Sequence, residues 1–375
     1  MNRRFLLFII AVALIAFPRH ALANAGTPLM WAGMFHLAIG NLFIGALEGW
    51  LLVRLFAVPG KRPFATMIGA NYFSAWVGGL FLNAAIVRYL PMDLNNGWLW
   101  FWLMAGVTYC ITLLLELPFV YLLVRSEPGA FKRSLKSSLA VQSISYILLF
   151  GWYGVAGETS LFTRANVVAP GTMALPDGVV VYFISAADGS VYRRELNGNR
   201  ETRVFDLKSS DLNDRLLVRP CQGTSNRWDL VARLETEDHR NPTIIPVLTN
   251  KIFEVALEWP VQTHQERPYR STWSNHGQVP VIGGATNRPL SYWAGFWEAS
   301  GLRVYDRASK SHERFAFETP FGAWAVRNAV QLTNDHVIFQ LGRDQVCAFN
   351  PRTRSVALLF HGRGPVPVLE AAGLR

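Results

Sequence analysis

The chain has 375 residues, of which 51% are hydrophobic, and a formal net charge of +10 at pH 7. The first 157 positions hold four acidic residues against eleven Lys and Arg, whereas residues 158–375 hold twenty-two acids and twenty-five bases. The positive excess lies mainly in the apolar half, so no basic stripe remains for a phosphate backbone, and we expect no nucleic-acid partner.

Residues 1–23 have the three parts of a secretory signal peptide. Arg3 and Arg4 form the charged start, an apolar core runs from Phe5 to Phe17, and Ala21-Leu22-Ala23 is a small-residue cleavage site. The apolar core is too short to cross a hydrocarbon layer about 30 Å thick. We therefore expect the mature chain to begin outside the cytoplasm.

Four longer apolar stretches follow, near residues 28–54, 64–90, 98–124 and 138–157. Each reaches the roughly 20 residues that a spanning helix needs. The loops after the first and third stretches are rich in Lys and Arg, and the positive-inside rule places such loops in the cytoplasm. We expect residues 24–157 to form a four-helix transmembrane domain of a bacterial inner (cytoplasmic) membrane, in contact with lipid. The C-terminal domain then lies outside the cytoplasm.

Polar residues inside the predicted spans are informative, because an ionisable group in hydrocarbon costs about 2.5 kcal/mol or more unless it is paired or solvated. One residue from each span falls at a comparable depth on the side of the basic loops. These four residues, the intramembrane polar layer, are Glu48, Asn71, Glu116 and Gln142. The layer is either a structural polar core or a proton or ion path, and the small number of spans favours the structural core.

Two more polar residues, His36 and Asn83, fall at the opposite depth of the predicted spans. On an unbroken α-helix, His36 is turned about 120° away from Glu48. We therefore expect this outer pair to be separate from the intramembrane polar layer.

From about residue 160 the pattern changes to short β-branched and aromatic runs bounded by Gly, Asn, Asp and Pro, which predicts an all-β domain over 158–375. Residues 176–192 resemble residues 333–347, and similar hairpin turns begin at Tyr305-Asp306 and Phe349-Asn350, 44 residues apart. This interval is close to the 40–45 residues of a propeller blade. We therefore predict a β-propeller or partial propeller, with a sandwich or an irregular barrel as alternatives.

The segment 208–300 breaks this interval and is rich in aromatic residues, Pro and Gly. Aromatic side chains on loops can stack on a ligand, although filling the core of a strand-poor segment is the favoured interpretation. The ligand-facing candidates are Trp259, Trp273, Trp293 and Trp297.

An extracytoplasmic location allows a disulfide between Cys221 and Cys347, with two separate buried thiols as the alternative. No Cys/His spacing indicates a metal site, and no motif indicates a cofactor, a nucleotide or a hydrolase nucleophile. We expect neither a metal nor a cofactor, and the sequence favours a protein that is not an enzyme.

These features favour a membrane-anchored extracytoplasmic binding or assembly module, in which the bundle holds the β domain at the membrane to engage an envelope protein or polymer. One alternative is a small transporter or channel subunit that uses the carboxylates of the intramembrane polar layer. Another is a cell-envelope enzyme with its site in the Trp-rich segment.

Overall fold

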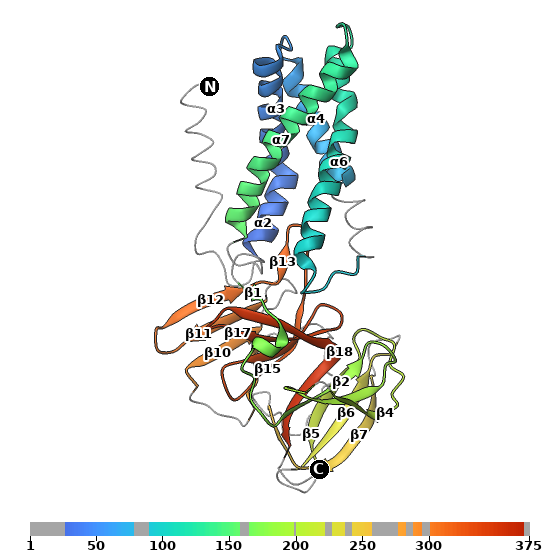
Figure 1. The fold of residues 1–375 in the computed structure, drawn as a ribbon, viewed down its shortest axis with the longest axis vertical. Coiled ribbons are helices and arrows are strands. Elements are labelled where there is room, and N and C mark those ends of the chain that lie inside the picture. Colours follow the sequence, from blue (N-terminus) through green and yellow to red (C-terminus); the bar gives the residue numbers. More distant parts are fainter. Residues whose placement is uncertain are drawn as a thin grey trace.

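The computed structural model has a helical part and a β part that lie end to end (Figure 1). It describes residues 27–78, 90–157, 165–198, 200–221, 227–236, 242–256, 277–282, 288–294 and 301–370. Several predicted features lie outside these residues, namely the signal peptide 1–23, Asn83, Trp259, Trp273 and Trp297.

Three helices are long and apolar enough to cross a membrane: Pro28–Phe56, Gly97–Val124 (α6) and Ala130–Ala156 (α7). The first consists of α2 (Pro28–Phe35), a π-helical segment (His36–Gly40) and α3 (Asn41–Phe56). The second predicted span begins as α4 (Arg62–Ala75), but residues 79–89 lie outside the described part. The chain is therefore a multi-pass membrane protein, while the number of four spans stays a prediction.

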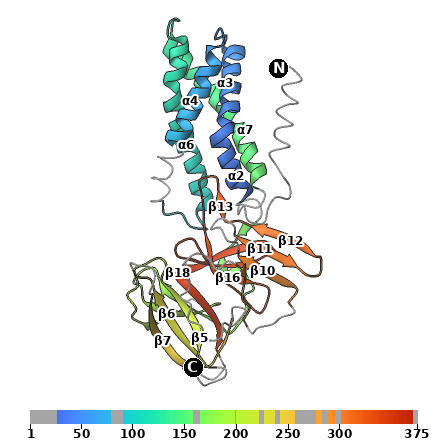
Figure 2. The same ribbon diagram turned by 180° about the vertical axis from the view of Figure 1, so that it is seen from behind.

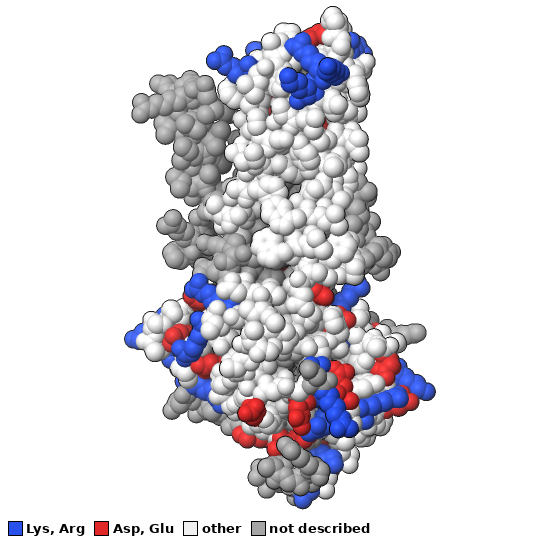
Figure 3. Space-filling view, in the orientation of Figure 1, with Lys and Arg blue, Asp and Glu red and all other residues white. Residues whose placement is uncertain are grey.

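The surface of the helical part has the apolar composition expected of a surface that faces lipid. Its exposed side chains are large and apolar, and Leu99, Leu114 and Ile147 are among the most exposed. Figure 3 shows an uncharged band over the helices, with Lys and Arg at the end away from the strands and mixed charges over the β part. A band of this kind matches a hydrocarbon layer bounded by two polar surfaces.

Two glycines bring α3 and α4 into close contact. A Cβ atom on Gly45 would lie 2.5 Å from the Cα atom of Ile68, and one on Gly49 would lie 2.7 Å from the Cα atom of Phe64. Membrane helices commonly approach through small residues spaced by four, because lipid provides no hydrophobic force between helices. The same face of α3 carries Glu48 between the two glycines.

The β part is built on a curled, mainly antiparallel sheet of nine strands, with the described order β15-β16-β17-β18-β2-β3-β4. Two further strands pair with β18, β1 in parallel and β8 antiparallel. In chain order, the strands are β1 (Asn166–Val167), β2 (Val179–Ser185), β3 (Val191–Glu195), β4 (Glu201–Phe205), β8 (Phe253–Val255), β15 (Val326–Gln331), β16 (Val337–Leu341), β17 (Gln345–Asn350) and β18 (Ser355–Glu370). The all-β expectation is confirmed for this part of the chain.

Three smaller sheets complete the described β part. One contains β5 (Arg215–Pro220), β6 (Trp228–Leu234) and β7 (Thr243–Lys251). Another contains β9 (Gly277–Gln278), β10 (Leu290–Ala294), β11 (Leu302–Asp306) and β12 (Ser311–Phe315). The third is the hairpin of β13 (Glu318–Thr319) and β14 (Gly322–Ala323).

No propeller is found among the described strands, and β18 shows why. Its first half pairs with β17 and its second half with β2, with an irregularity between Arg363 and Val366 where Gly364 has a φ of +54°. One bent strand therefore joins two sets of hairpins into a half-barrel, whereas propeller blades are separate sheets around a channel. The predicted propeller is not found here.

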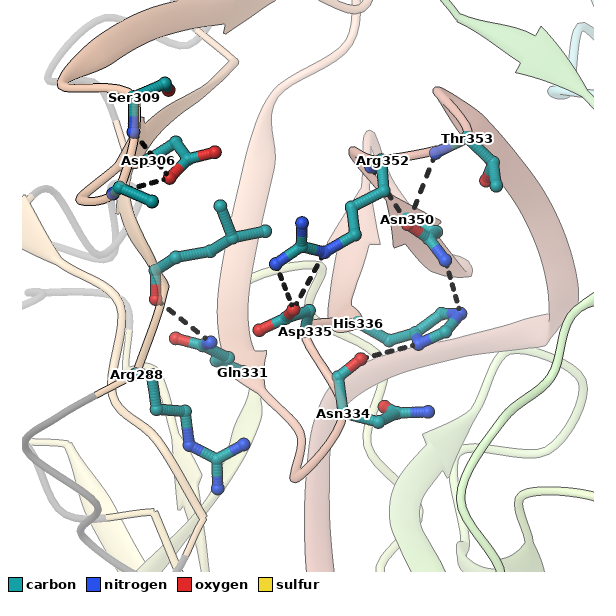
Figure 4. Close-up of polar contacts among 12 residues, drawn as sticks. Arg288, Asp306, Ser309, Gln331, Asn334, Asp335, His336, Asn350, Arg352 and Thr353 are labelled. Carbon is teal, nitrogen blue, oxygen red and sulfur yellow. Dashed lines mark hydrogen bonds and ion pairs between the residues drawn. The ribbon is translucent and has the colours of Figure 1, made fainter.

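The repeat that indicated blades has a local cause, shown in Figure 4. Asp306 accepts a hydrogen bond from the amide of Ala308 at 2.8 Å, and Asn350 accepts one from the amide of Arg352 at 3.0 Å. Both side chains thus close the turn after a strand, β11 or β17. Turns with Asp or Asn in this position recur in many folds. The similarity between the two segments therefore reflects how each turn is closed and does not indicate the order of the strands in a sheet.

The two parts of the molecule are joined by specific contacts as well as by the chain. Leu94, just before α6, is packed in the same buried cluster as Phe317 and Phe339. Its amide donates a hydrogen bond to the side chain of Gln345 at 2.6 Å. The hairpin of β13 and β14 extends from the β part to the base of the helices, as Figures 1 and 2 show from opposite sides.

Candidate functional site

A pocket of about 460 Å³ runs between the helices. At its β-facing end it is lined by Trp98 and Phe101 of α6 and by the β13–β14 hairpin, and at its far end by Glu48 and Glu116. Trp98 and Glu116 are five helical turns apart on α6, about 27 Å. The pocket is therefore elongated, and its walls are mainly apolar between the two ends.

The intramembrane polar layer forms the far end of this pocket. Asn71 Nδ2 on α4 donates to Glu48 Oε2 on α3 at 2.5 Å. Glu116 Oε1 on α6 accepts from the hydroxyl of Ser74 at 2.5 Å, and its other oxygen accepts from Gln142 Nε2 on α7. The structure thus brings the four predicted residues together from four helices, with Glu48 0% exposed and Glu116 1% exposed.

Local packing explains why these side chains meet. The glycine contact between α3 and α4 places Glu48 directly against α4. The Asn71 amide is also held by a bond to the carbonyl of Met67 at 3.0 Å, which orients its second hydrogen toward Glu48. A buried carboxylate is stable in hydrocarbon only when such donors replace water.

His36 lies on the same pocket wall, closer to the β part. Its Nδ1 atom is 2.8 Å from the hydroxyl of Tyr153 on α7. The expected 120° separation from Glu48 assumed an unbroken α-helix, but His36 begins the π-helical segment. Because a π-helix turns less per residue than an α-helix, the segment brings both residues onto the pocket.

The β-facing end of the pocket contains a third carboxylate, Glu318 of β13. Its Oε2 atom accepts a hydrogen bond from the hydroxyl of Thr27 at 2.6 Å. Burial raises the pKa of Glu318 to about 7, although the Thr27 bond and the charge of Arg314 act in the opposite direction. Next to it, Phe321 packs against Phe101 with ring centroids 5.8 Å apart. The hairpin is therefore docked onto the helices by one polar and one aromatic contact.

Sequence reasoning did not identify Thr27 or Glu318 as site residues. Thr27 precedes a proline and caps α2, which is a recognisable helix start. Residues 318–323 contain Pro320 and Gly322, which are typical of a turn. Neither signal indicates that the two segments, 291 positions apart, contact each other.

The other predicted candidates that the structure describes, Trp293, Cys221 and Cys347, do not line the pocket. Trp293 in β10 is 52% exposed and pairs with neighbouring strands of the small sheet. The disulfide that the sequence allows is not formed, since Cys221 and Cys347 are both free. Cys347 is buried within β17, whereas the Cys221 thiol donates to Asp229 at 3.1 Å near the edge of another sheet. Burial raises the pKa of the Cys347 thiol.

The described residues contain no group of three or more His, Cys, Asp and Glu side chains that could hold a metal ion. The pocket therefore offers carboxylates, amides and hydroxyls at its ends and apolar surface between them. Such a site can bind a molecule by shape and hydrogen bonds.

No protein-family model matches the sequence, and a comparison with curated proteins finds no match. The function is therefore argued from the geometry of this chain.

Proposed function

We propose that the protein is a membrane-anchored binding module that holds one amphipathic ligand between its helical bundle and its β domain. The observation that carries this proposal is the elongated pocket, polar at both ends and apolar between them. Its volume of about 460 Å³ lies within the range of about 300–1,000 Å³ that is common for ligand sites.

The orientation belongs to the same proposal. The Lys and Arg residues of the helical part gather at the end away from the strands (Figure 3). The positive-inside rule puts this end in the cytoplasm, so the β domain of this bacterial inner-membrane protein lies outside it. There the β domain is positioned to engage an envelope protein or polymer while its hairpin contacts the bound ligand.

A transporter or channel subunit is the second candidate, because the pocket reaches carboxylates deep in the bundle. A path to the other side would have to continue past Glu48 toward Arg54. That region is filled by a buried apolar cluster that includes Leu52, Met67 and Val124. Tight apolar packing beyond the polar layer favours binding over conduction.

The test uses the full-length protein in lipid nanodiscs and 4-phenylbutanol, an uncharged soluble amphiphile, followed by isothermal titration calorimetry. We expect saturable binding with a Kd below about 1 mM. Ala105→Phe, which fills the pocket wall, should abolish it. Cys110→Phe is the matched control, because Cys110 lies on the same helix but faces outward.

Two results would overturn the proposal: no saturable binding by the wild type, or binding that survives Ala105→Phe unchanged. Flux measurements in proteoliposomes test the second candidate. A cation flux that disappears with Glu116→Gln, while phenylbutanol binding is unaffected, would favour transport.

A further inference from the structure

The β13–β14 hairpin enters the β-facing end of the pocket. Residues 318–321 line the pocket together with Leu29 of α2 and Phe101 of α6. Phe101 lies four residues after the start of α6 at Gly97, about 6 Å along the helix axis. Figures 1 and 2 show the hairpin between the bases of α2 and α6. The hairpin therefore stands in the path along the bundle axis at this end.

The opposite end of this path is closed. Beyond the intramembrane polar layer, a buried apolar cluster that includes Leu52, Met67 and Val124 fills the bundle. Apolar cores of this kind are close-packed and leave little room for a ligand. Within the described part of the bundle, a ligand that moves along the axis therefore has to pass the hairpin.

The hairpin can move without disrupting the larger sheets. It consists of two residue pairs within residues 318–323, and no strand of another described sheet pairs with it. At its neck, the amide of Trp324 donates to the carbonyl of Phe317 at 2.8 Å, and Phe317 packs against Phe339 with ring centroids 5.2 Å apart. A small element with few contacts opens more readily than the core that carries it. Residues 318–323 can therefore pivot at this neck.

Two side-chain contacts hold the hairpin against the helices. The Thr27 hydroxyl donates to Glu318 at 2.6 Å and accepts from the amide of Met30 at the start of α2. On the other side, Phe321 packs against Phe101 of α6. Both contacts have to break when the hairpin leaves the pocket, so each of them sets how often it undocks.

We propose that the β13–β14 hairpin is a lid on the pocket, which undocks to let the ligand enter or leave and docks again to retain it. This inference rests on the proposed binding function and adds how access to that site is controlled. Because the ligand passes only while the hairpin is undocked, the rates of entry and release both depend on how often undocking occurs. A residue that holds the lid acts on both rates, whereas a wall residue that contacts the ligand acts mainly on release.

The experiment measures both rates on the full-length protein in nanodiscs with 4-(4-bromophenyl)butanol, whose bromine atom quenches the fluorescence of a nearby indole. Trp98 and Trp102 line the pocket, so stopped-flow fluorescence follows entry after mixing and release after dilution. Ala105→Phe, which fills the pocket wall, gives the background from quencher dissolved in the lipid.

Thr27→Val is the first lid variant, because it removes the hydrogen bond to Glu318 at a residue that does not line the pocket. We expect the rates of entry and release to rise together by roughly two- to tenfold, the value of one hydrogen bond, while the Kd stays nearly unchanged. Thr27→Ser keeps the hydroxyl and should retain the wild-type rates.

A pair of phenylalanine variants tests the lid from its other side. Phe321→Ala removes the contact with Phe101 and should also raise both rates. Phe150→Ala is its matched control, because Phe150 lines the same pocket from α7 and its described ring contacts lie within the bundle. It should raise the release rate alone. This pair remains informative if Thr27→Val disturbs the start of α2.

The outcomes separate the two proposals. Unchanged entry rates in both Thr27→Val and Phe321→Ala would overturn the lid, because the ligand would then enter between the helices, and would leave the binding function standing. Absence of saturable quenching in the wild type would overturn the binding function itself. Equal effects of Phe321→Ala and Phe150→Ala on the entry rate would also contradict the lid, because the effect would then not depend on the hairpin.

Discussion

The helical part and the β part bury different kinds of side chains. In the helical part the buried residues include Glu48, Glu116 and Gln142, while leucines and tryptophans cover the outside. In the β part the largest buried side chains are aromatic, such as Phe183 and Phe349. Lipid dissolves apolar side chains as well as a protein core does. Apolar burial therefore stabilises the β part, whereas close contact and hydrogen bonds stabilise the bundle.

The largest effect expected from this difference is at Phe349. Its side chain is 0% exposed and packs against Phe315 with ring centroids 4.7 Å apart. Phe349→Ala should lower the free energy of unfolding of the β part by about 3–5 kcal/mol, because it removes buried apolar surface and leaves a cavity. Thermal unfolding of the full-length protein in nanodiscs, followed by circular dichroism, measures the change.

The control is Leu114→Ala on α6, where the side chain is 71% exposed on the outer surface of the bundle. Because Leu114 contacts lipid both in the folded bundle and after the bundle unfolds, we expect Leu114→Ala to change the free energy of unfolding by less than about 0.5 kcal/mol. A comparable loss in both variants would show that apolar burial acts equally in the two parts, and the comparison would fail.

The next effect concerns close packing in the bundle. Gly45→Ala should destabilise the helical part by about 1–3 kcal/mol, because the new Cβ atom would press on the backbone of α4 at Ile68. Gly69→Ala on α4 is the control: no atom lies within 4 Å of its added Cβ, and alanine favours a helix. Unfolding by denaturing detergent should separate the two variants, and equal stability would contradict the role assigned to the glycine contact.

Much of this architecture could be predicted from the sequence, and the reasons differ by region. The membrane thickness and the 3.6-residue period fix depth and facing, so Glu48 and Glu116 could be placed on a common layer without any contact information. The period fails at His36, where a π-helical segment changes the rotation per residue. No local pattern in the sequence encoded that change.

Contacts between segments that are far apart in the sequence could not be predicted from it. The turns at Asp306 and Asn350 look alike because both use a side chain to close a hairpin, but strand order depends on the bend of β18 near Gly364. The contact of Glu318 with Thr27 likewise depends on how the β part docks. The layer residues, whose depth follows from the helical rise per residue, were thus predictable, whereas the carboxylate supplied by the hairpin was not.

The docking of the hairpin predicts a pH effect of intermediate size. The pKa of Glu318 is about 7 in the docked state and about 4.5 for a free carboxyl group, so the docked state favours the protonated form. Its contribution to docking is complete below about pH 4.5 and is lost progressively as pH rises from there to about 7. Hydrogen exchange of residues 316–324 should therefore quicken between about pH 5 and pH 7 and change little above that, after correction for the intrinsic rate.

Glu318→Gln should remove this pH dependence, because the amide remains uncharged and can still accept from Thr27. Glu313→Gln is the control, since Glu313 lies on β12, where its side chain is 38% exposed and pairs with Arg354. If exchange at the hairpin showed the same pH profile in the Glu318→Gln variant, another group would control docking.

The smallest effect is expected at the surface of the β part, where water replaces lipid. Arg354, in the turn before β18, forms an ion pair with Glu313 of β12 at 2.8 Å, and both side chains are more than a third exposed. Water and salt screen such a pair, so a double-mutant cycle with Arg354→Ala and Glu313→Ala should give a coupling of about 0.2–1 kcal/mol that falls with added salt. A larger, salt-independent coupling would mean that this pair behaves like the buried contacts of the bundle, where no water competes for the charged atoms.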